Sequence, residues 1–484
     1  MSEFETARNT RTILLAVVVI VVVVAGGIIG FLFLGGQGPT DTTTDTEPSG
    51  AEITILTRHD VAIHNVFEPI FLQSDFAQDN GITSILWKTP SAEFWDELLD
   101  RGEIDVCWGG GPTIFDQLMR DGRLATLDSE LMQEVADRVP DQIAGANMKR
   151  NDTEDNLKWM AAAISTFGFT VNHQFLDEYD LPTPGKWTDL ANATYGSLLP
   201  TIPTIAMGNA PDTTSNTRIY EIITQGLGWD TGWQTMARMA GSANIYSGSV
   251  ETQAASENGD VGISMSIDFY GYLTQYRNPD CEYIIPEGQT IVNGDPIAIP
   301  NNAPNQEYAE GFVDFVMSCE GQALWLDPSI RRMPVLECAF RQPGAEDAQD
   351  LYAVYNQTVD TEGIDFNDTL SLQINSAFTK YFESVFTQAH TELVDTWNLL
   401  VSSYLDGDIT EGEFESFASM MGTPVTIVDP DTSEEEKFTT EYAIEINEKM
   451  IYDADFASTV QSLWTAAAKA AYQDVYNQVS ALLT

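Results

Sequence analysis

The chain has 484 residues, enough for two or three domains that each bury a hydrophobic core. Its 22 Lys and Arg residues against 73 Asp and Glu residues give a formal net charge of −51. A surface this acidic repels phosphate backbones and anionic headgroups, so nucleic acid and acidic membrane surfaces are poor partners. A hydrophobic content of 43% indicates a globular protein.

Residues 13–34 form an uncharged, apolar run close to the N-terminus. This run exceeds the roughly 20 residues that a helix needs to cross a bilayer. Arg8 and Arg11 precede it, and the next basic residue is Arg58. The positive-inside rule therefore predicts a single-pass cell-membrane anchor, with residues 1–12 in the cytoplasm and the rest of the chain outside.

The segment after the apolar run, residues 35–50, is rich in Gly, Thr, Asp and Pro. This composition predicts a flexible tether between the membrane and a folded body. Cleavage after Ala25 or Gly27, which would remove the anchor as a signal sequence, is an open alternative.

The folded body begins with alternating strand and helix patterns. Strands are predicted at 52–57, 82–88 and 104–108, and helices at 61–76, 91–101 and 113–121. This alternation is typical of a parallel sheet covered by helices. Polar or flexible stretches follow two of the strands, at residues 58–60 and 109–113. The carboxyl ends of such strands border the crevice where ligands bind in open α/β sheets.

A second set of elements follows. We expect strands at 159–171, 198–207 and 261–267, and helices at 219–226, 229–239, 250–257 and 308–317. Residues 213–217 are Ser-, Thr- and Asn-rich and precede a helix, where free backbone N–H groups suit an anionic or polar group. The same residues could equally serve as a helix cap.

Several motifs occur in an order that resembles a known family. They read LTRHD, GEIDVCWGGGPTIFDQL, FGFTVN, YSGS, NGDVGISMSIDFYGY, EGFVDFVMSCEGQALWLDP and RRMPVL. The series resembles the extracellular solute-binding components of ABC importers, in the branch of ferric-iron, thiamine, polyamine and phosphonate binders.

The resemblance implies an α/β, two-lobe periplasmic-binding-protein fold of type II over residues 51–345. Lobe one would combine residues 52–161 and 300–341, and lobe two would hold residues 168–290. Crossing segments are expected at 161–168 and 291–299, with hinge closure around the ligand. An ABC permease and its ATPase subunits are the implied partners.

The resemblance also implies which residues line the cleft between the lobes. They are Arg58, His59, Asp60, Gly110, Gly111, Thr113, Ser165, Thr166, Thr213, Thr214, Ser215, Asn216, Tyr246, Ser247, Asp268 and Tyr270. Iron-binding members place adjacent tyrosines where this chain has Phe269 and Tyr270, which argues against a ferric site. A polar organic solute, anionic or zwitterionic, is the leading interpretation.

Residues 346–484 extend beyond the usual end of the family. The spacing of apolar residues predicts a mainly helical extension with a hairpin at 425–442, and Thr410 to Glu413 is a capping box. The extension either docks on a lobe or forms a helical module of its own.

The sequence carries no H-E-x-x-H, G-x-S-x-G or P-loop motif, so we expect a binding protein without catalytic residues, metal or cofactor. A ligand-sensing surface protein and a ferric-iron binder are the alternatives. The four cysteines show no C-x-x-C spacing. Cys319 and Cys338 could form a disulfide, which their spacing cannot establish.

Overall fold

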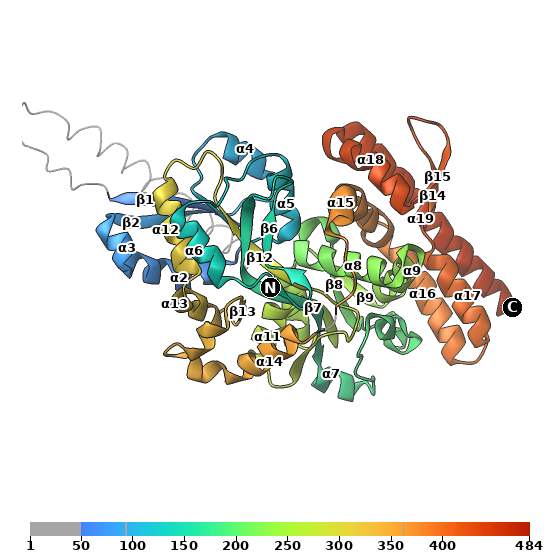
Figure 1. Ribbon diagram of the computed structural model, residues 1–484. Helices are drawn as coiled ribbons and strands as arrows, with labels where there is room; N and C mark the ends of the chain where they lie inside the picture. The colour runs from blue at the N-terminus through green and yellow to red at the C-terminus, as the bar shows by residue number, and fades with distance from the viewer. Residues whose placement is uncertain (1–49, 92–93, 362) are drawn as a thin grey trace, which may run out of the picture. The chain divides into compact units, whose positions relative to one another are not determined.

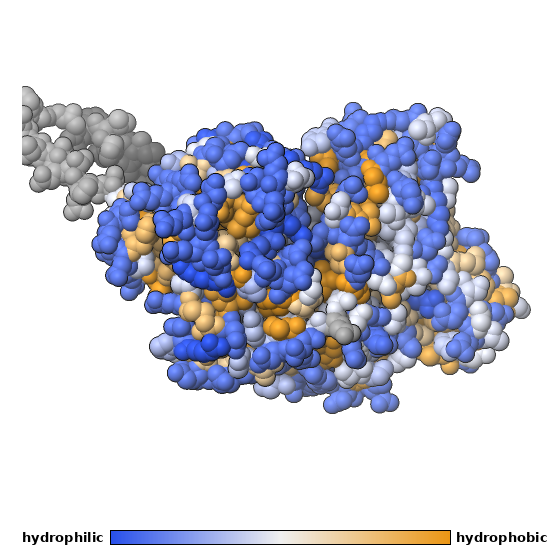
Figure 2. Space-filling model, in the orientation of Figure 1, coloured by the Kyte–Doolittle hydropathy of each residue, from blue (hydrophilic) through white to orange (hydrophobic). Residues whose placement is uncertain are grey.

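The computed structural model describes residues 50–91, 94–361 and 363–484. The predicted membrane anchor and tether lie outside these residues, except for Gly50. Within the described part of the chain, no helix is both long and apolar enough to cross a membrane. Figure 2 shows a predominantly hydrophilic face, as the acidic composition predicts.

Lobe one is built on three parallel strands, as the alternating pattern predicted. They are β1 (Ala51–Thr57), β2 (Ile82–Lys88) and β3 (Val106–Trp108). The helices of this lobe are α2 (Val61–Gln73), α3 (Asp75–Asp79), α4 (Trp95–Asp100), α5 (Pro112–Arg120), α6 (Glu130–Arg138), α12 (Gln306–Val316) and α13 (Cys319–Ala323). Helix α6 was not predicted from the sequence.

The long strand β7 (Leu157–Asn172) belongs to both lobes. Its first part pairs antiparallel with β12 (Val292–Ala298), from Ile297 opposite Met160 to Val292 opposite Thr166. Its second part pairs antiparallel with β10 (Ile263–Ile267), from Ile267 opposite Phe167 to Ile263 opposite Val171. The chain therefore passes from one lobe to the other at residues 166–167 without leaving the sheet.

Lobe two contains the parallel strands β8 (Ile205–Gly208), β9 (Ala243–Tyr246) and β10. Its helices are α7 (His173–Glu178), α8 (Thr214–Leu227), α9 (Trp229–Gly241), α10 (Ser249–Glu257) and α11 (Asp268–Arg277). The strand expected at 198–207 starts only at Ile205. Pro200 and Pro203 lack the N–H group that a strand needs in its ladder, which explains the late start.

Eleven strands of the described residues form one sheet. Its main order is β2-β1-β3-β12-β7-β10-β8-β9, and β6 (Lys149–Asn151), β11 (Cys281–Ile284) and β13 (Met333–Pro334) also pair with β7. The two-residue strands β4 (Gln142–Ile143) and β5 (Ala146–Asn147) pair with each other. Each lobe has its own large hydrophobic core, and the lobe-two core extends into the C-terminal extension.

The extension is helical and carries the predicted hairpin. It consists of α15 (Asp368–Phe382), a π-helical turn (Glu383–Thr387), α16 (His390–Leu405), α17 (Glu411–Gly422), β14 (Thr426–Val428), β15 (Glu435–Lys437), α18 (Thr440–Tyr452) and α19 (Ala454–Leu482). The capping box of Thr410 and Glu413 is confirmed. The two strands and the turn of the hairpin lie within the predicted range of 425–442. The hairpin ends earlier than predicted, because α18 begins at Thr440.

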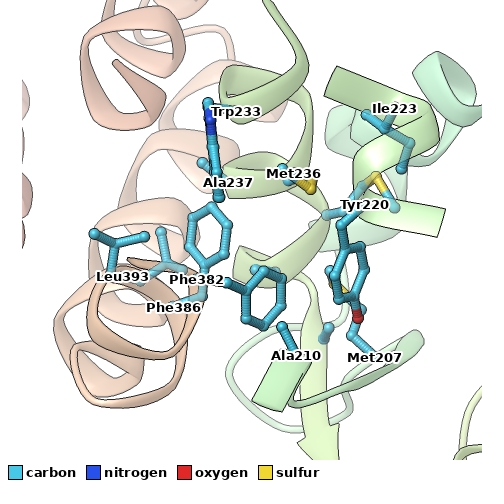
Figure 3. Close-up of a cluster of buried hydrophobic side chains, with 14 of the residues drawn as sticks. Met207, Ala210, Tyr220, Ile223, Trp233, Met236, Ala237, Phe382, Phe386 and Leu393 are labelled. Carbon is cyan, nitrogen blue, oxygen red and sulfur yellow. The ribbon is translucent and has the colours of Figure 1, made fainter. Parts of the chain in front are cut away.

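The extension docks on lobe two. Figure 3 shows Phe382, Phe386 and Leu393 of the extension beside residues of lobe two that include Tyr220 and Trp233. The rings of Tyr220 and Phe382 stack with their centroids 4.4 Å apart. Of the two arrangements considered for the extension, the shared core supports docking on a lobe.

A disulfide joins Cys319 at the start of α13 to Cys338, with a Cα–Cα distance of 5.4 Å. Cys338 lies in a short 3-10 turn, Glu337–Arg341, which is followed by α14 (Gln349–Val359). Cys107 and Cys281 are free and buried.

Candidate functional site

The carboxyl ends of both sets of parallel strands point to the crossing of β7. In lobe two, β10 ends at Ile267 opposite Phe167, and β8 and β9 run parallel to β10. In lobe one, Trp108 at the end of β3 pairs with Ile297, and the following residue, Gly109, bonds to Pro296. The other end of β12, at Val292, lies opposite Thr166 of β7. The loops after both sets of strands therefore meet near the hinge.

A buried ion cluster of His59, Asp295 and Arg332 lies on the lobe-one side of this crossing. The Asp295 Oδ2 atom is 2.8 Å from His59 Nε2 and 3.1 Å from an Arg332 Nη2 atom. Burial alone would raise the pKa of the Asp295 carboxyl, but the charge of Arg332 and the bond to His59 together lower this pKa. Burial lowers the pKa of His59, and its ring packs against Trp108 and Trp325.

Asp268 at the start of α11 is fully buried beside the crossing. Its carboxylate accepts hydrogen bonds from the backbone N–H groups of Thr166 (2.9 Å) and Phe269 (2.7 Å). Burial raises the pKa of Asp268 to about 7, although these bonds and Arg332 oppose the shift. Arg332 also donates a hydrogen bond to the Ser165 hydroxyl at 3.3 Å. Asp268 is also the first residue of α11, so it and Tyr270 lie in the first turn of a helix.

A hydroxyl cluster of Thr213, Ser215 and Ser249 joins the N-termini of α8 and α10. The Ser249 Oγ atom lies 2.6 Å from Thr213 Oγ1 and 2.7 Å from Ser215 Oγ. Asn216 Nδ2 lies 3.4 Å from the same Ser249 oxygen. Thr213 caps α8, and Ser249 is the first residue of α10. Two helix N-termini, whose first N–H groups have no acceptor within their own helix, therefore adjoin one another at the carboxyl edge of the lobe-two strands.

The remaining predicted residues are half-buried or exposed at the ends of the same strands. They are Arg58, Asp60, Gly110, Gly111, Thr113, Thr214, Tyr246, Ser247 and Tyr270. Next to Tyr270, the ring centre of Phe269 in lobe two lies 4.9 Å from the guanidinium of Arg332 in lobe one, so residues of both lobes approach each other there. Asp60 caps α2 by accepting a bond from the Ala62 N–H at 2.8 Å.

The structure thus divides the predicted residues into three groups. The first group is buried and is connected through Asp295 and Arg332 near the crossing of β7, a set of contacts that we call the hinge network; it contains His59, Ser165, Thr166 and Asp268. Thr213 and Ser215 belong to the hydroxyl cluster, Asn216 contacts it through Ser249, and the others lie at the rim. His59 is 7% exposed, and a hydrogen bond with Asp295 holds its ring in the interior.

Two residues of these groups were missed in the sequence. Asp295 and Arg332 complete the buried ion cluster. Ser249, the centre of the hydroxyl cluster, belongs to the YSGS motif that carries the resemblance. The tandem Arg331-Arg332 was a usable signal, because the chain has 22 basic residues in all and a pair next to an apolar stretch calls for partners. Nothing around Asp295 in the sequence distinguishes it from the many exposed acidic residues.

The described residues contain no group of three or more His, Cys, Asp or Glu side chains arranged to hold a metal ion. Burial raises the pKa of the Tyr270 phenol to about 12, which opposes formation of a phenolate ligand. Tyr272 is 4% exposed, and its ring packs against Tyr283.

The chain is similar to a bacterial protein whose name refers to transport. The chain is 23% identical over 315 residues to the phosphoglycerate transport regulatory protein PgtC of Salmonella typhimurium, covering 64% of this chain and 71% of the relative.

Solved structures of two periplasmic binding proteins have the same fold. AfuA from Actinobacillus pleuropneumoniae, with fructose-6-phosphate bound, is 16% identical, with 72% of this chain and 97% of AfuA covered and a TM-score of 0.51. The periplasmic binding protein P5PA is 16% identical, with 72% and 98% covered and a TM-score of 0.50. These likenesses confirm the mixed α/β, two-lobe periplasmic-binding-protein fold.

The family model of the bacterial extracellular solute-binding proteins matches residues 104–357, more than half of the chain. The chain therefore belongs to this family, the solute-binding proteins of ABC importers.

Proposed function

We propose that the chain captures a small organic anion, a phosphate ester or carboxylate, between its two lobes and delivers it to an ABC permease. The observation that carries the choice of an anion is the junction of the α8 and α10 N-termini at the hydroxyl cluster. Each N-terminus carries roughly half a positive charge, and the hydroxyls can donate to anionic oxygens. In this role the protein binds and releases its solute without chemical change.

The charges opposite lobe two also support an anion. Arg332 lies at the crossing with its guanidinium 4.9 Å above the ring of Phe269 in lobe two. Arg58 is half-buried at the end of β1, and its Nη1 atom bonds to the Pro90 carbonyl at 3.3 Å. Arg332 is paired with Asp295, so Arg58 is the arginine whose charge can attract an anion that the rest of the acidic surface repels.

The names of the relatives agree with this class of solute. One is a phosphoglycerate transport regulatory protein, and a structure with the same fold holds fructose-6-phosphate. A ferric ion finds less support, because Phe269 stands where a second tyrosine is needed and the Tyr270 phenol holds its proton.

The test is a thermal-shift and calorimetric screen of the purified chain. We expect 3-phosphoglycerate or a hexose phosphate to raise the melting temperature, because a ligand at 100 times its Kd adds about 2.7 kcal/mol to stability. A neutral hexose, spermidine, thiamine and ferric citrate should give little or no shift. Binding of spermidine or iron with no response to any anion would contradict the proposal.

A sensing role is the second candidate, because the curated relative is described as a regulatory protein of transport. Binding would then change the contacts of the chain with a signalling partner rather than feed a permease. Uptake of labelled solute by cells that lack the chain separates the two, since a transport component is required for uptake even when the permease genes are expressed from a constitutive promoter.

We further propose that the folded body lies outside the cell, anchored by residues 13–34. The Cys319–Cys338 disulfide supports an oxidising location, where such bonds persist. Protease treatment of intact cells should degrade the body, and its full protection would contradict this location.

A further inference from the structure

We propose that the start of α15, in the C-terminal extension, is a tie between the lobes, with Asp368 bridging Arg150 of lobe one and Arg218 of lobe two. The tie favours the approached arrangement of the lobes before any solute binds. This inference rests on the proposed function only for the hinge motion, and it adds a role for a segment beyond the end of the family match at residue 357.

Asp368 is the first residue of α15, and its two carboxylate oxygens serve different lobes. Oδ2 accepts a hydrogen bond from Arg150 Nη2 at 3.0 Å, and Oδ1 accepts one from Arg218 Nη2. Asn367 caps the helix by accepting a bond from the Leu370 N–H at 3.0 Å. The carboxylate is therefore held at the helix N-terminus, where a negative charge is favourable.

Arg150 is fixed to lobe one. It lies on β6 and pairs with Trp159 of β7, and its guanidinium is 5.4 Å from the centre of the Trp159 ring. Its Nε atom is 3.4 Å from Asp116 on α5. Helix α15 also contacts α5, and Figure 1 shows these two helices beside each other.

Arg218 is fixed to lobe two. It is 5% exposed on α8, with its guanidinium 4.0 Å above the ring of Phe366. Its bond to Glu221, one turn along α8, is 3.4 Å long. It also reaches Asn293 of the crossing strand β12 at 3.3 Å. Burial raises the pKa of Glu221 and of Asp116, whereas the two arginines lower the pKa of Asp368. Of these three carboxylates, Asp368 is therefore the one that pairs with both arginines.

The segment before α15 is hydrogen-bonded to residues at the hinge. The Ile364 N–H donates to the Thr290 carbonyl at 2.9 Å, and the Thr290 hydroxyl donates to the Phe167 carbonyl at 2.6 Å. Phe167 is the residue at which β7 passes into lobe two. The rest of the extension shares the lobe-two core, and Thr387 bonds to Asn209 in the loop before α8 at 2.7 Å.

Since the extension is packed into lobe two, it moves with that lobe. Opening the hinge then separates Asp368 from Arg150 while the bond to Arg218 persists. A charge-assisted hydrogen bond is stronger than a neutral one, so its loss should shift the equilibrium between open and approached lobes by roughly tenfold or more.

The test measures the distance between the lobes in the full chain without ligand. Spin labels are placed by Asp79→Cys on α3 and Gln174→Cys on α7, both exposed, while the native free thiols Cys107 and Cys281 are buried. Asp368→Asn should lengthen or broaden the distance distribution and weaken solute binding roughly tenfold. Arg150→Gln, which removes only the lobe-one arm, should have the same effect.

The control is Glu415→Gln, because Glu415 pairs with Arg238 at 2.8 Å between the extension and lobe two alone. It should leave the distance distribution unchanged. If Asp368→Asn fails to fold, Arg150→Gln decides the question. An unchanged distribution in the folded variants would overturn the tie even if the chain binds anions. Altered distances in a protein that binds no anion would instead retain the tie and contradict the proposed solute.

Discussion

The guanidinium group of Arg332 lies 4.9 Å from the centre of the Phe269 ring, and the two residues belong to different lobes. Arg332 precedes β13, which pairs with the lobe-one part of β7, whereas Phe269 lies in α11, directly after β10 of lobe two. A cation over an aromatic ring is attracted by the ring electrons. This contact and the bond between Arg332 and Asp295 connect the hinge to both lobes.

Arg332→Gln should destabilise the fold by roughly 3–5 kcal/mol, because removing one partner of a buried ion pair leaves the other charge uncompensated. The free energy of unfolding, measured by urea denaturation at pH 7, checks this value. Arg138→Gln is the matched control, since the Arg138–Asp314 pair is about one-third exposed. Its loss should cost less than about 1 kcal/mol.

The effect of Arg332→Gln should depend on pH in one direction. Arg332 helps to lower the pKa of Asp295 in the folded state below its unfolded value of about 3.9. The stabilisation from this ionised carboxylate is present above that unfolded value and is lost as the pH falls through the folded pKa. Because burial without Arg332 raises the pKa of Asp295, the stability difference between wild type and variant should shrink as the pH falls from the variant's higher pKa toward the lowered pKa of the wild type. A constant difference from pH 7 to pH 3 would contradict the assigned role of Asp295.

Ser249→Ala should weaken binding of an anionic solute roughly tenfold, because a hydrogen bond to a charged group contributes about 1.5–3 kcal/mol. Titration calorimetry with the best anion from the screen measures the change. Ser462→Ala on the exposed face of α19 removes a hydroxyl of the same type far from both helix N-termini and should leave affinity unchanged. Equal affinities for all three proteins would remove the hydroxyl cluster from the binding site.

Gly109→Ala should disrupt the hinge network, because a Cβ atom at this position would lie 2.1 Å from His59 Nε2. Gly109 also has a backbone φ of +75°, a conformation that residues with a side chain rarely adopt. Gly122 has a similar φ of +68°, but beyond its chain neighbours no atom lies within 4 Å of an added Cβ, so Gly122→Ala isolates the backbone cost of about 1 kcal/mol. The melting temperature should fall clearly further in Gly109→Ala, and equal shifts would show that His59 adapts freely.

Much of the fold could be predicted from the sequence, because its signals are local. The strand pattern of β7 and the alternation of strands and helices in lobe one follow from apolar periodicity and turn residues. The start of α11 at Asp268 could not be predicted in the same way. Its aromatic and polar residues resemble a loop, and the bond that holds Asp268 at its start comes from the Thr166 N–H group, 102 positions away in the sequence.

The candidate site was harder to predict than the fold. Residues 213–217 carry a local signal, since a polar cluster before a helix offers free N–H groups. The bond between Asp295 and His59 joins residues 236 positions apart, and no spacing rule reveals such a pair. The same holds for Asp368, whose two arginines come from β6 and α8.

Trp397→Ala tests whether the extension and lobe two form one cooperative unit. Trp397 on α16 is fully buried against Gly241 of α9, and its Nε1 atom donates to the Ser242 hydroxyl at 2.8 Å. Truncating a buried tryptophan costs about 3–5 kcal/mol. Because the core is shared, calorimetry should show the lobe-two transition shifted together with that of the extension.

Tyr452→Ala is the control for Trp397→Ala, since Tyr452 is 78% exposed at the end of α18 and its truncation should change stability by less than about 0.5 kcal/mol. If Trp397→Ala instead produced a separate low-temperature transition with solute binding unchanged, the extension would unfold alone. Lobe two would then keep its structure without the extension. A joint transition with weakened binding is the expected result, because α8 packs against the extension through the stacked Tyr220 and Phe382 rings and begins at the hydroxyl cluster.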